Sequence, residues 1–212
     1  MRALESRSAR PRFHERFIAR TADAMNHLAS WKVWLLLAGA FAVCAAVFFR
    51  TDAPFSIPTV QRLCGAPPLD VRFTSSTADV ERFLGGCGVD GRSAYRNMLL
   101  ADLLYPLVFG MFMASSLALA IAKVAPERPR LRSLAAVALI GSGFDYLENL
   151  LAYRALGAFP GRVATTQLLG MASAAKTSTF WLAGVGLLGL LVVVGVRQIG
   201  ARRRRRTADM MG

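Results

Sequence analysis

The stretch from residue 98 to residue 122 reads MLLADLLYPLVFGMFMASSLALAIA. It contains no Lys or Arg and a single acidic residue, Asp102. A helix of about 20 mainly apolar residues is long enough to cross a hydrocarbon core roughly 30 Å thick. The stretch therefore predicts a transmembrane helix.

Three further segments have the same length and apolar character, namely residues 31–49, 133–152 and 172–196. The composition agrees with a membrane protein, because 54% of the residues are hydrophobic and only 18% are charged, whereas a soluble domain is about a quarter charged. The first segment is expected to remain as an anchor, since its apolar run is longer than the roughly 7–15 residues of a signal-peptide core. We therefore predict an all-α integral membrane protein with four transmembrane helices.

The charges give an orientation. The net charge is +13, and the excess lies in the tail 1–30, the short loop 123–132 and the Arg-rich tail 197–212, whereas residues 50–97 are nearly balanced. Cytoplasmic segments carry the excess of Lys and Arg. The sequence thus predicts a multi-pass protein of the plasma (inner) membrane with both termini cytoplasmic, and with residues 50–97 and 153–171 on the external side, the latter including the start of the last helix.

The basic tails suggest lipid rather than nucleic acid as their partner, because the sequence has no aromatic or fold support for nucleic-acid binding. In the first tail, Phe17, Met25, Leu28 and Trp31 recur near helical spacing among basic residues. This pattern fits a helix lying on an anionic leaflet. A solvated tail that only enforces topology remains the alternative.

The external loop of about 47 residues between the first two spans contains two helix signals. Ser76 and Asp79 have the spacing of a capping box before an apolar face that ends at Gly85-Gly86, and a second helix is expected to follow Pro58. Cys64 and Cys87 both lie in this loop. On an oxidising side of the membrane they are expected to form a disulfide, with two free thiols as the alternative.

Four ionisable residues lie within the apolar segments: Asp102, Asp145, Glu148 and Lys176. A charge at the centre of a bilayer costs at least about 2.5–3.5 kcal/mol, so such residues need partners, water or a function. At a rise of about 1.5 Å per residue, all four fall in the external half of their helices. One cluster can therefore contain them.

Helical spacing adds polar neighbours to this cluster. Asn149 shares a face with Asp145 and Glu148, while Tyr95 and Tyr105 share one with Asp102. Pro106 is expected to break the second helix, because it cannot donate to the carbonyl of Asp102. Three acids against one lysine leave a formal charge of −2, so an acid is expected to be protonated or to meet Arg92 or Arg96.

The function predicted from these residues is a polar pocket within the membrane that is open to the external side and binds a lipid or small molecule. Three alternatives remain: a purely structural ion network, a membrane-embedded acid/base enzyme that acts on a lipid-like substrate, and a proton-coupled transporter, for which four spans would need a homo-oligomer. In the enzyme, Glu148 or Asp145 would be the general acid/base and Lys176 would stabilise negative charge. The residues expected to hold a ligand are Arg92, Tyr95, Asp102, Tyr105 and Asn149. No cofactor or metal is expected, because both histidines lie in the first tail.

The polar residues form a recognisable series: Gly91-Arg92-x-x-Tyr95, Asp102-x-x-Tyr105-Pro106, Asp145-x-x-Glu148-Asn149 and Lys176. With this series the chain resembles a group of uncharacterised bacterial multi-helix integral membrane proteins over residues 85–180. Those proteins usually have Phe where this chain has Tyr105. The resemblance implies that the polar residues lie together, and it brings no known activity.

Overall fold

Four long apolar helical segments account for most of the chain. The structure is a computed structural model, and it describes residues 13–161 and 166–209, without the side chains of 203–208. In this part of the chain, the segments long and apolar enough to span a membrane are Trp31–Arg50, Gly88–Val124, Pro129–Ala158 and Thr166–Arg202. The predicted all-α architecture with four such helices is confirmed.

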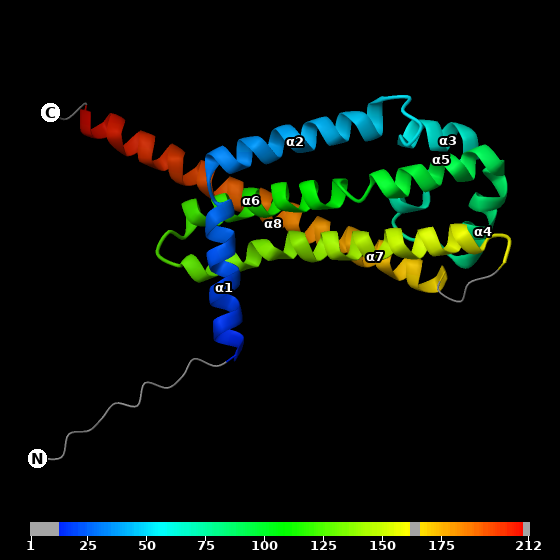
Figure 1. The fold of residues 1–212 in the computed structure, drawn as a ribbon. Coiled ribbons are helices and arrows are strands. Elements are labelled where there is room, and N and C mark those ends of the chain that lie inside the picture. Colours follow the sequence, from blue (N-terminus) through cyan, green and yellow to red (C-terminus); the bar gives the residue numbers. More distant parts are fainter. Residues whose placement is uncertain (1–12, 162–165, 210–212) are drawn as a thin grey trace, which may run out of the picture.

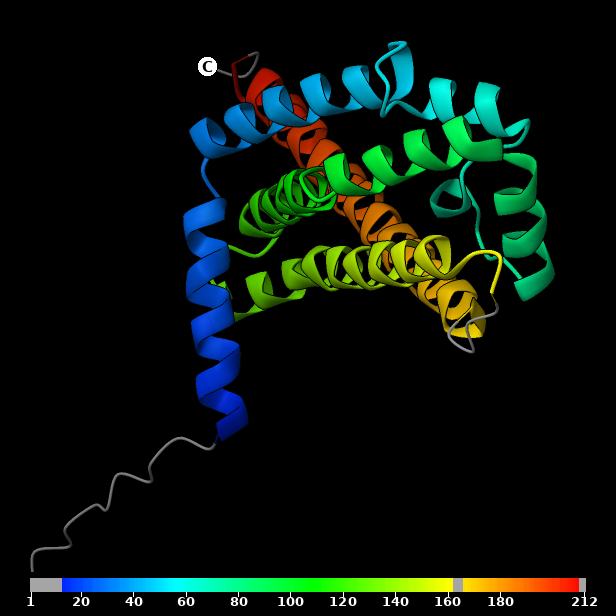
Figure 2. The ribbon, with the colours of Figure 1, turned by 45° about the vertical axis from the view of Figure 1, so that its right-hand side comes forward.

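The helices run alongside one another, with shorter elements at both ends (Figure 1). The long elements are α2 (Trp31–Arg50), α6 (Tyr105–Val124), α7 (Val137–Ala158) and α8 (Thr166–Asp209). Helix α8 crosses behind α6 and α7 obliquely (Figure 2). Its contact with α7 is the most extensive between any two elements described.

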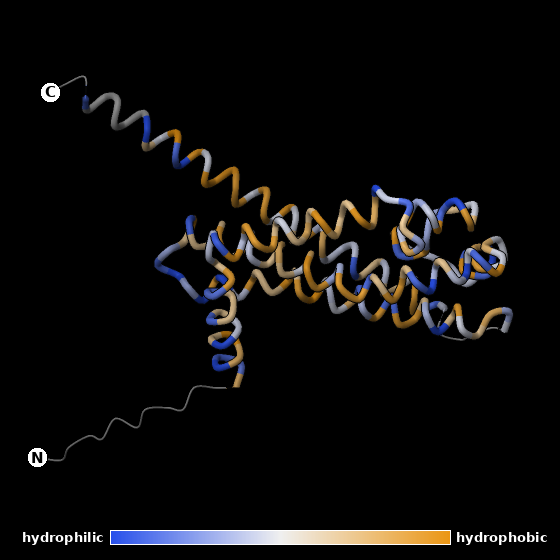
Figure 3. The backbone as a smooth tube through the Cα atoms, turned by 45° about the horizontal axis from the view of Figure 1, so that its top comes forward, coloured by the Kyte–Doolittle hydropathy of each residue, from blue (hydrophilic) through white to orange (hydrophobic). Residues whose placement is uncertain are grey.

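Much apolar surface on the outside of the bundle remains uncovered. Leu36 of α2 and Trp181, Leu182 and Val185 of α8 are each more than half exposed. Apolar residues follow one another along both helices (Figure 3). Exposed apolar surface on this scale is unfavourable in water and favourable in hydrocarbon, so these helices indicate contact with a lipid bilayer.

The second spanning segment is broken, as the proline suggests. Helix α5 (Gly88–Ala101) ends with Asp102 as its C-cap, and α6 begins at Tyr105 with Pro106 in its first turn. Helix α7 provides donors to the backbone at the break: Tyr146 donates to the Leu103 carbonyl at 2.7 Å and Ser142 to the Pro106 carbonyl at 2.7 Å. Such side-chain donors allow a helix to break at membrane depth.

The segment between the first two spans is mostly helical. It contains α3 (Ile57–Cys64), the 3-10 turn η1 (Leu69–Val71), α4 (Thr77–Gly86) and the first turns of α5, which starts ten residues before the predicted span at 98. The capping box is confirmed, because Ser76 and Asp79 exchange side-chain to backbone hydrogen bonds at 2.9 and 3.2 Å. The helix after Pro58 is also present, and Cys64 and Cys87 form the predicted disulfide.

The first tail forms a helix, α1 (Phe13–Leu28), which lies across the end of the bundle opposite α3 and α4 (Figure 1). Its inner side is attached: Met25 is buried, and Ser115 of α6 donates to the Leu28 carbonyl at 2.7 Å. Its outer side leaves Phe13 and Phe17 mostly exposed. The predicted helix is therefore present over Phe13–Leu28.

Both ends of the described chain lie at the end of the bundle where α1 lies (Figure 1). The last helix starts at Thr166, earlier than the predicted 172, and continues through the Arg run to Asp209. The connection between α6 and η2 (Pro129–Ala136) lies at the same end. The core divides accordingly into one cluster near α3–α5 and another around Met25 and Ala114.

Candidate functional site

A cavity of about 300 Å³ lies between the spanning helices near η1. Its lining combines apolar and aromatic side chains with charged ones. The lining residues are Phe48, Phe49, Ile57, Asp70, Val71, Asp102, Tyr105, Asp145 and Lys176. Three of the four predicted intramembrane ionisable residues therefore share one cavity wall, and Lys176 connects the fourth to them.

Lys176 of α8 is the centre of the charged part of this lining. It is 9% exposed, and its ammonium forms ion pairs with Glu148 and, at 3.4 Å, with Asp145 Oδ1. It also donates to the Asp70 backbone carbonyl at 2.7 Å. The i+3 spacing of Asp145 and Glu148 on α7 places both carboxylates toward the same turn of α8, so one lysine connects α7, α8 and η1.

Glu148 is the most enclosed of the acids, with no exposed surface. Its carboxylate is held between Lys176 and the Ser173 hydroxyl, which donates to Oε1. Ser173 lies one helical turn before Lys176 on α8, so the two donors approach from the same helix. A buried carboxylate needs such partners to remain in the interior.

Asp102 lies at the break between α5 and α6. It is 7% exposed, and its Oδ2 accepts a hydrogen bond from Asn149 Nδ2 at 2.6 Å. Among the residues that the structure describes, no Lys, Arg or His forms an ion pair with it. The structure therefore brings Asp102 and Asn149 together, as predicted, and gives this carboxylate an amide as partner in place of a cation.

Asp70 is a site residue that the sequence did not reveal. It belongs to η1, which folds back so that the Asp70 carbonyl reaches Lys176 and its side chain lines the cavity. In the described part of the chain its Oδ1 is buried without a hydrogen-bond partner. Burial raises the pKa of Asp70 from 3.8 to about 6, an effect that the Lys176 ammonium partly opposes. No sequence pattern around residue 70 identifies Asp70 as a site residue. The sequence predicted only that it belongs to the external loop.

The two predicted tyrosines lie in different surroundings. Tyr105 lines the cavity, and its ring lies 5.7 Å from Phe48 and 6.1 Å from Phe49 between centroids. Tyr95 is fully buried and packs edge-on against Phe83 at 5.1 Å. Its hydroxyl has no hydrogen-bond partner in the described residues. Tyr105 thus contributes to the cavity wall, whereas Tyr95 belongs to the core beside it.

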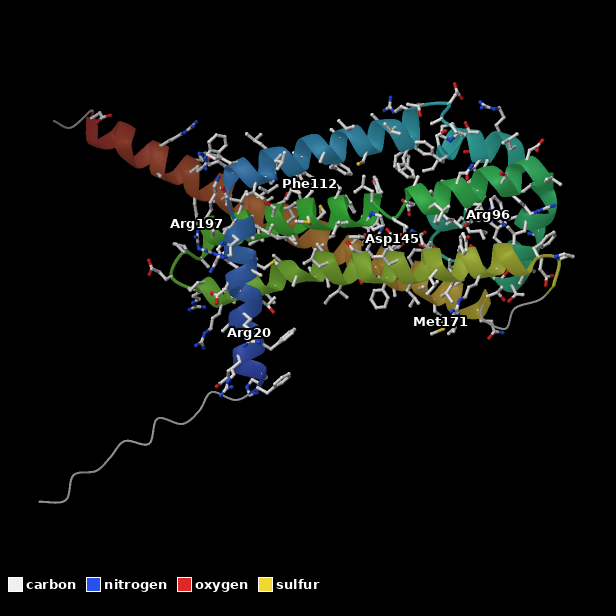
Figure 4. All side chains as sticks on the ribbon, viewed as in Figure 1. Arg20, Arg96, Phe112, Asp145, Met171 and Arg197 are labelled. Carbon is white, nitrogen blue, oxygen red and sulfur yellow. A yellow bond between two sulfur atoms is a disulfide. The ribbon has the colours of Figure 1, made fainter. Side chains whose placement is uncertain are left out.

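The two arginines expected at the mouth of the helices do not meet the acids. Arg92 donates to the Leu84 carbonyl at 3.1 Å and lies 5.2 Å from the centre of the Phe159 ring. Arg96 is exposed on α5, toward the end of the bundle and away from the interior position of Asp145 (Figure 4). Arg92 thus lies beside the C-cap of α7, away from the acids, a placement that the sequence spacing alone did not determine.

The site combines four carboxyls with one ammonium: Asp70, Asp102, Asp145 and Glu148 with Lys176. Such a set can bind a cation or exchange protons, because carboxylates only accept hydrogen bonds and a protonated carboxyl also donates. No group of three or more His, Cys, Asp or Glu in the described ranges is arranged to hold a metal ion.

Comparisons with known proteins find no family model, no curated protein and no solved structure that matches this chain.

Proposed function

We propose that this chain is a membrane protein whose spanning helices form a ligand-binding pocket open to the external side, which takes a lipid or a small molecule. The observation that supports this most directly is the cavity of about 300 Å³ with Asp102 on its wall. Pockets of about 300–1,000 Å³ with apolar walls and few polar groups are typical ligand sites. A structural ion network alone has no need of a cavity, or of a carboxylate without a cation.

Co-purification provides the test. Native mass spectrometry of the chain extracted in a mild detergent should detect a bound molecule. Val71→Trp fills the cavity from η1 and should abolish the additional mass. Val89→Trp is the matched control, because Val89 is 75% exposed and does not line the cavity. The proposal is wrong if Val71→Trp retains the molecule, or if the wild type carries none and no added lipid or small molecule raises its Tm.

The orientation of the chain belongs to the same proposal. Support comes from the basic segments and from the position of both described chain ends at the end of the bundle where α1 lies. A reporter active only in the cytoplasm should be active when fused at Ser30, Glu127 or Thr207 and silent at Ser75. Activity at Ser75, or silence at Glu127, would contradict this topology.

We also propose that anionic lipids bind at the cytoplasmic end. Helix α1 supports this, because it combines exposed Phe13 and Phe17 with the basic residues Arg16 and Arg20. Replacing Arg16 and Arg20 by Gln should lower the amount of co-purifying phosphatidylglycerol and leave phosphatidylethanolamine unchanged. Equal retention of both lipids by the variant would refute the proposal.

A further inference from the structure

The charge carried by a ligand of this pocket follows from the groups that remain available on its wall. An ammonium has three N–H donors. Those of Lys176 meet Glu148, Asp145 and the Asp70 carbonyl. Among the described residues that line the cavity, Lys176 is the only cation, and it has no further donor for an anionic ligand. The groups left for a ligand are acceptors.

Asp102 is the strongest of these acceptors. It is more than nine-tenths buried, lines the cavity and has the Asn149 amide but no ion pair among the described residues. A carboxylate removed from water without a cation is costly. A positive group on a ligand would replace the favourable interactions with water that the Asp102 carboxylate loses on burial. The same group would meet Asp70, which also lines the cavity.

The end of α5 favours the same charge. Asp102 is the C-cap of this helix. The last carbonyls of a helix carry partial negative charge, and cations are stabilised beside them. Broken transmembrane helices use their C-terminal ends in this way to hold cations. At the break, the Asp102 side chain thus presents negative charge to the cavity.

The apolar part of the cavity lining suits a hydrocarbon body better than a hydrated metal ion. Phe48, Phe49 and Tyr105 present their rings there, and Ile57 and Val71 complete the apolar surface. Aromatic faces attract ligand cations and also bury apolar groups. Phe48 is buried and Phe49 is 47% exposed, so the aromatic wall extends from the interior to the molecular surface.

We propose that the ligand is a small organic cation, whose ammonium binds Asp102 and Asp70 while its apolar or aromatic body packs on Phe48, Phe49 and Tyr105. This inference rests on the proposed pocket and specifies the class of its ligand. A cavity of about 300 Å³ takes a compact amine rather than a two-chain lipid.

Three probes of similar shape and different charge test it: phenethylamine, phenethyl alcohol and phenylpropanoate. Each is titrated calorimetrically into the full chain in detergent micelles at neutral pH, with empty micelles as the blank. Phenethylamine should bind at least about tenfold more tightly than the alcohol, and phenylpropanoate should bind more weakly than both. Equal binding of all three would overturn the cationic class and leave the pocket standing. Binding of none would overturn the inference, while the pocket retains its own test in the co-purifying molecule.

Variants locate the effect. Asp102→Asn should lower phenethylamine affinity by about tenfold or more and leave the alcohol unchanged. Asp90→Asn removes an equal charge from an exposed position of α5 and should change neither affinity. Where Asp102→Asn does not fold, Asp70→Asn in η1 should give a loss of the same selectivity. Unchanged preference for the amine in a folded Asp102→Asn or Asp70→Asn chain would refute the assignment of the ammonium to these carboxylates.

Discussion

Replacing Lys176 by Met removes the cation that connects three elements of the site. The substitution leaves Glu148 and Asp145 without their ion pairs, and the Asp70 carbonyl without its donor. The side chains of the two carboxylates are 0% and 9% exposed. Breaking a buried pair by removing one partner costs about 3–5 kcal/mol, and a buried carbonyl left without its donor costs about 1–3 kcal/mol. Protonation of the stranded acids recovers part of this, so we expect a net loss of about 3–5 kcal/mol.

The assay is reversible unfolding in mixed micelles of a mild detergent and increasing dodecyl sulfate, followed by circular dichroism. Lys123→Met is the matched control, because Lys123 is exposed at the end of α6 and its loss should cost less than about 0.5 kcal/mol. Adding Glu148→Gln to Lys176→Met should restore part of the stability, since one fewer carboxyl then needs a proton. If Lys176→Met unfolds together with the wild type, the ammonium is hydrated and the cluster is not a buried network.

Three other substitutions test separate parts of the structure. Cys64→Ser should lower the free energy of unfolding by about 3 kcal/mol in the chain-entropy model for a separation of 23 residues. The gel mobility of the wild type should change on reduction. Free labelling of both thiols by a membrane-impermeant maleimide before reduction would disprove the disulfide. Gly110→Ala should cost about 1–3 kcal/mol in the same unfolding assay, because the new Cβ would lie 1.9 Å from the Ser142 hydroxyl. Gly143→Ala is the control and should cost little, because nothing lies within 4 Å of its Cβ position. Equal losses would show that α6 and α7 are not in this close contact. The pKa of Asp70 is raised from 3.8 to about 6 in the folded state, so its ionisation opposes folding. The free energy of unfolding should therefore fall by up to about 3 kcal/mol as the pH rises from about 4 to about 6. Asp70→Asn should lack that part of the fall, and parallel pH profiles of variant and wild type would contradict it.

The break at Pro106 shows how far local sequence reasoning reached. A proline has no N–H, so the interruption of the second span could be predicted from its position. The donors that support the break could not, because Tyr146 and Ser142 belong to another helix and reach it only through packing. The Ser76–Asp79 capping box is likewise local, and it could be predicted from the sequence. The depth at which α4 lies in the structure depends on tertiary packing, and it could not be predicted.

The ion cluster, too, could be predicted from the sequence only in part. Apolar length and helical spacing place Asp102, Asp145, Glu148 and Lys176 toward the same end of their helices, and this follows from the fixed rise and period of an α-helix. They do not say which acid meets the lysine, because the rotation of each helix about its axis depends on packing against its neighbours. In the structure, Glu148 and Asp145 form ion pairs with Lys176, and Asp102 accepts a hydrogen bond from Asn149. Arg92 contacts Leu84 and Phe159 instead.

The sequence by itself determined the apolar character of this protein, its four helices that are long and apolar enough to span a membrane, and the placement of four ionisable residues within these helices. These properties depend on composition and on periodicities of a few residues, which any helix in a bilayer must obey. Only the tertiary structure decided that Asp70, far along the chain from Lys176, completes the site, and that Phe48 and Phe49 form the wall of its cavity. The physical reason is that contacts between distant segments are chosen by the shapes of whole packed surfaces, which no local pattern contains.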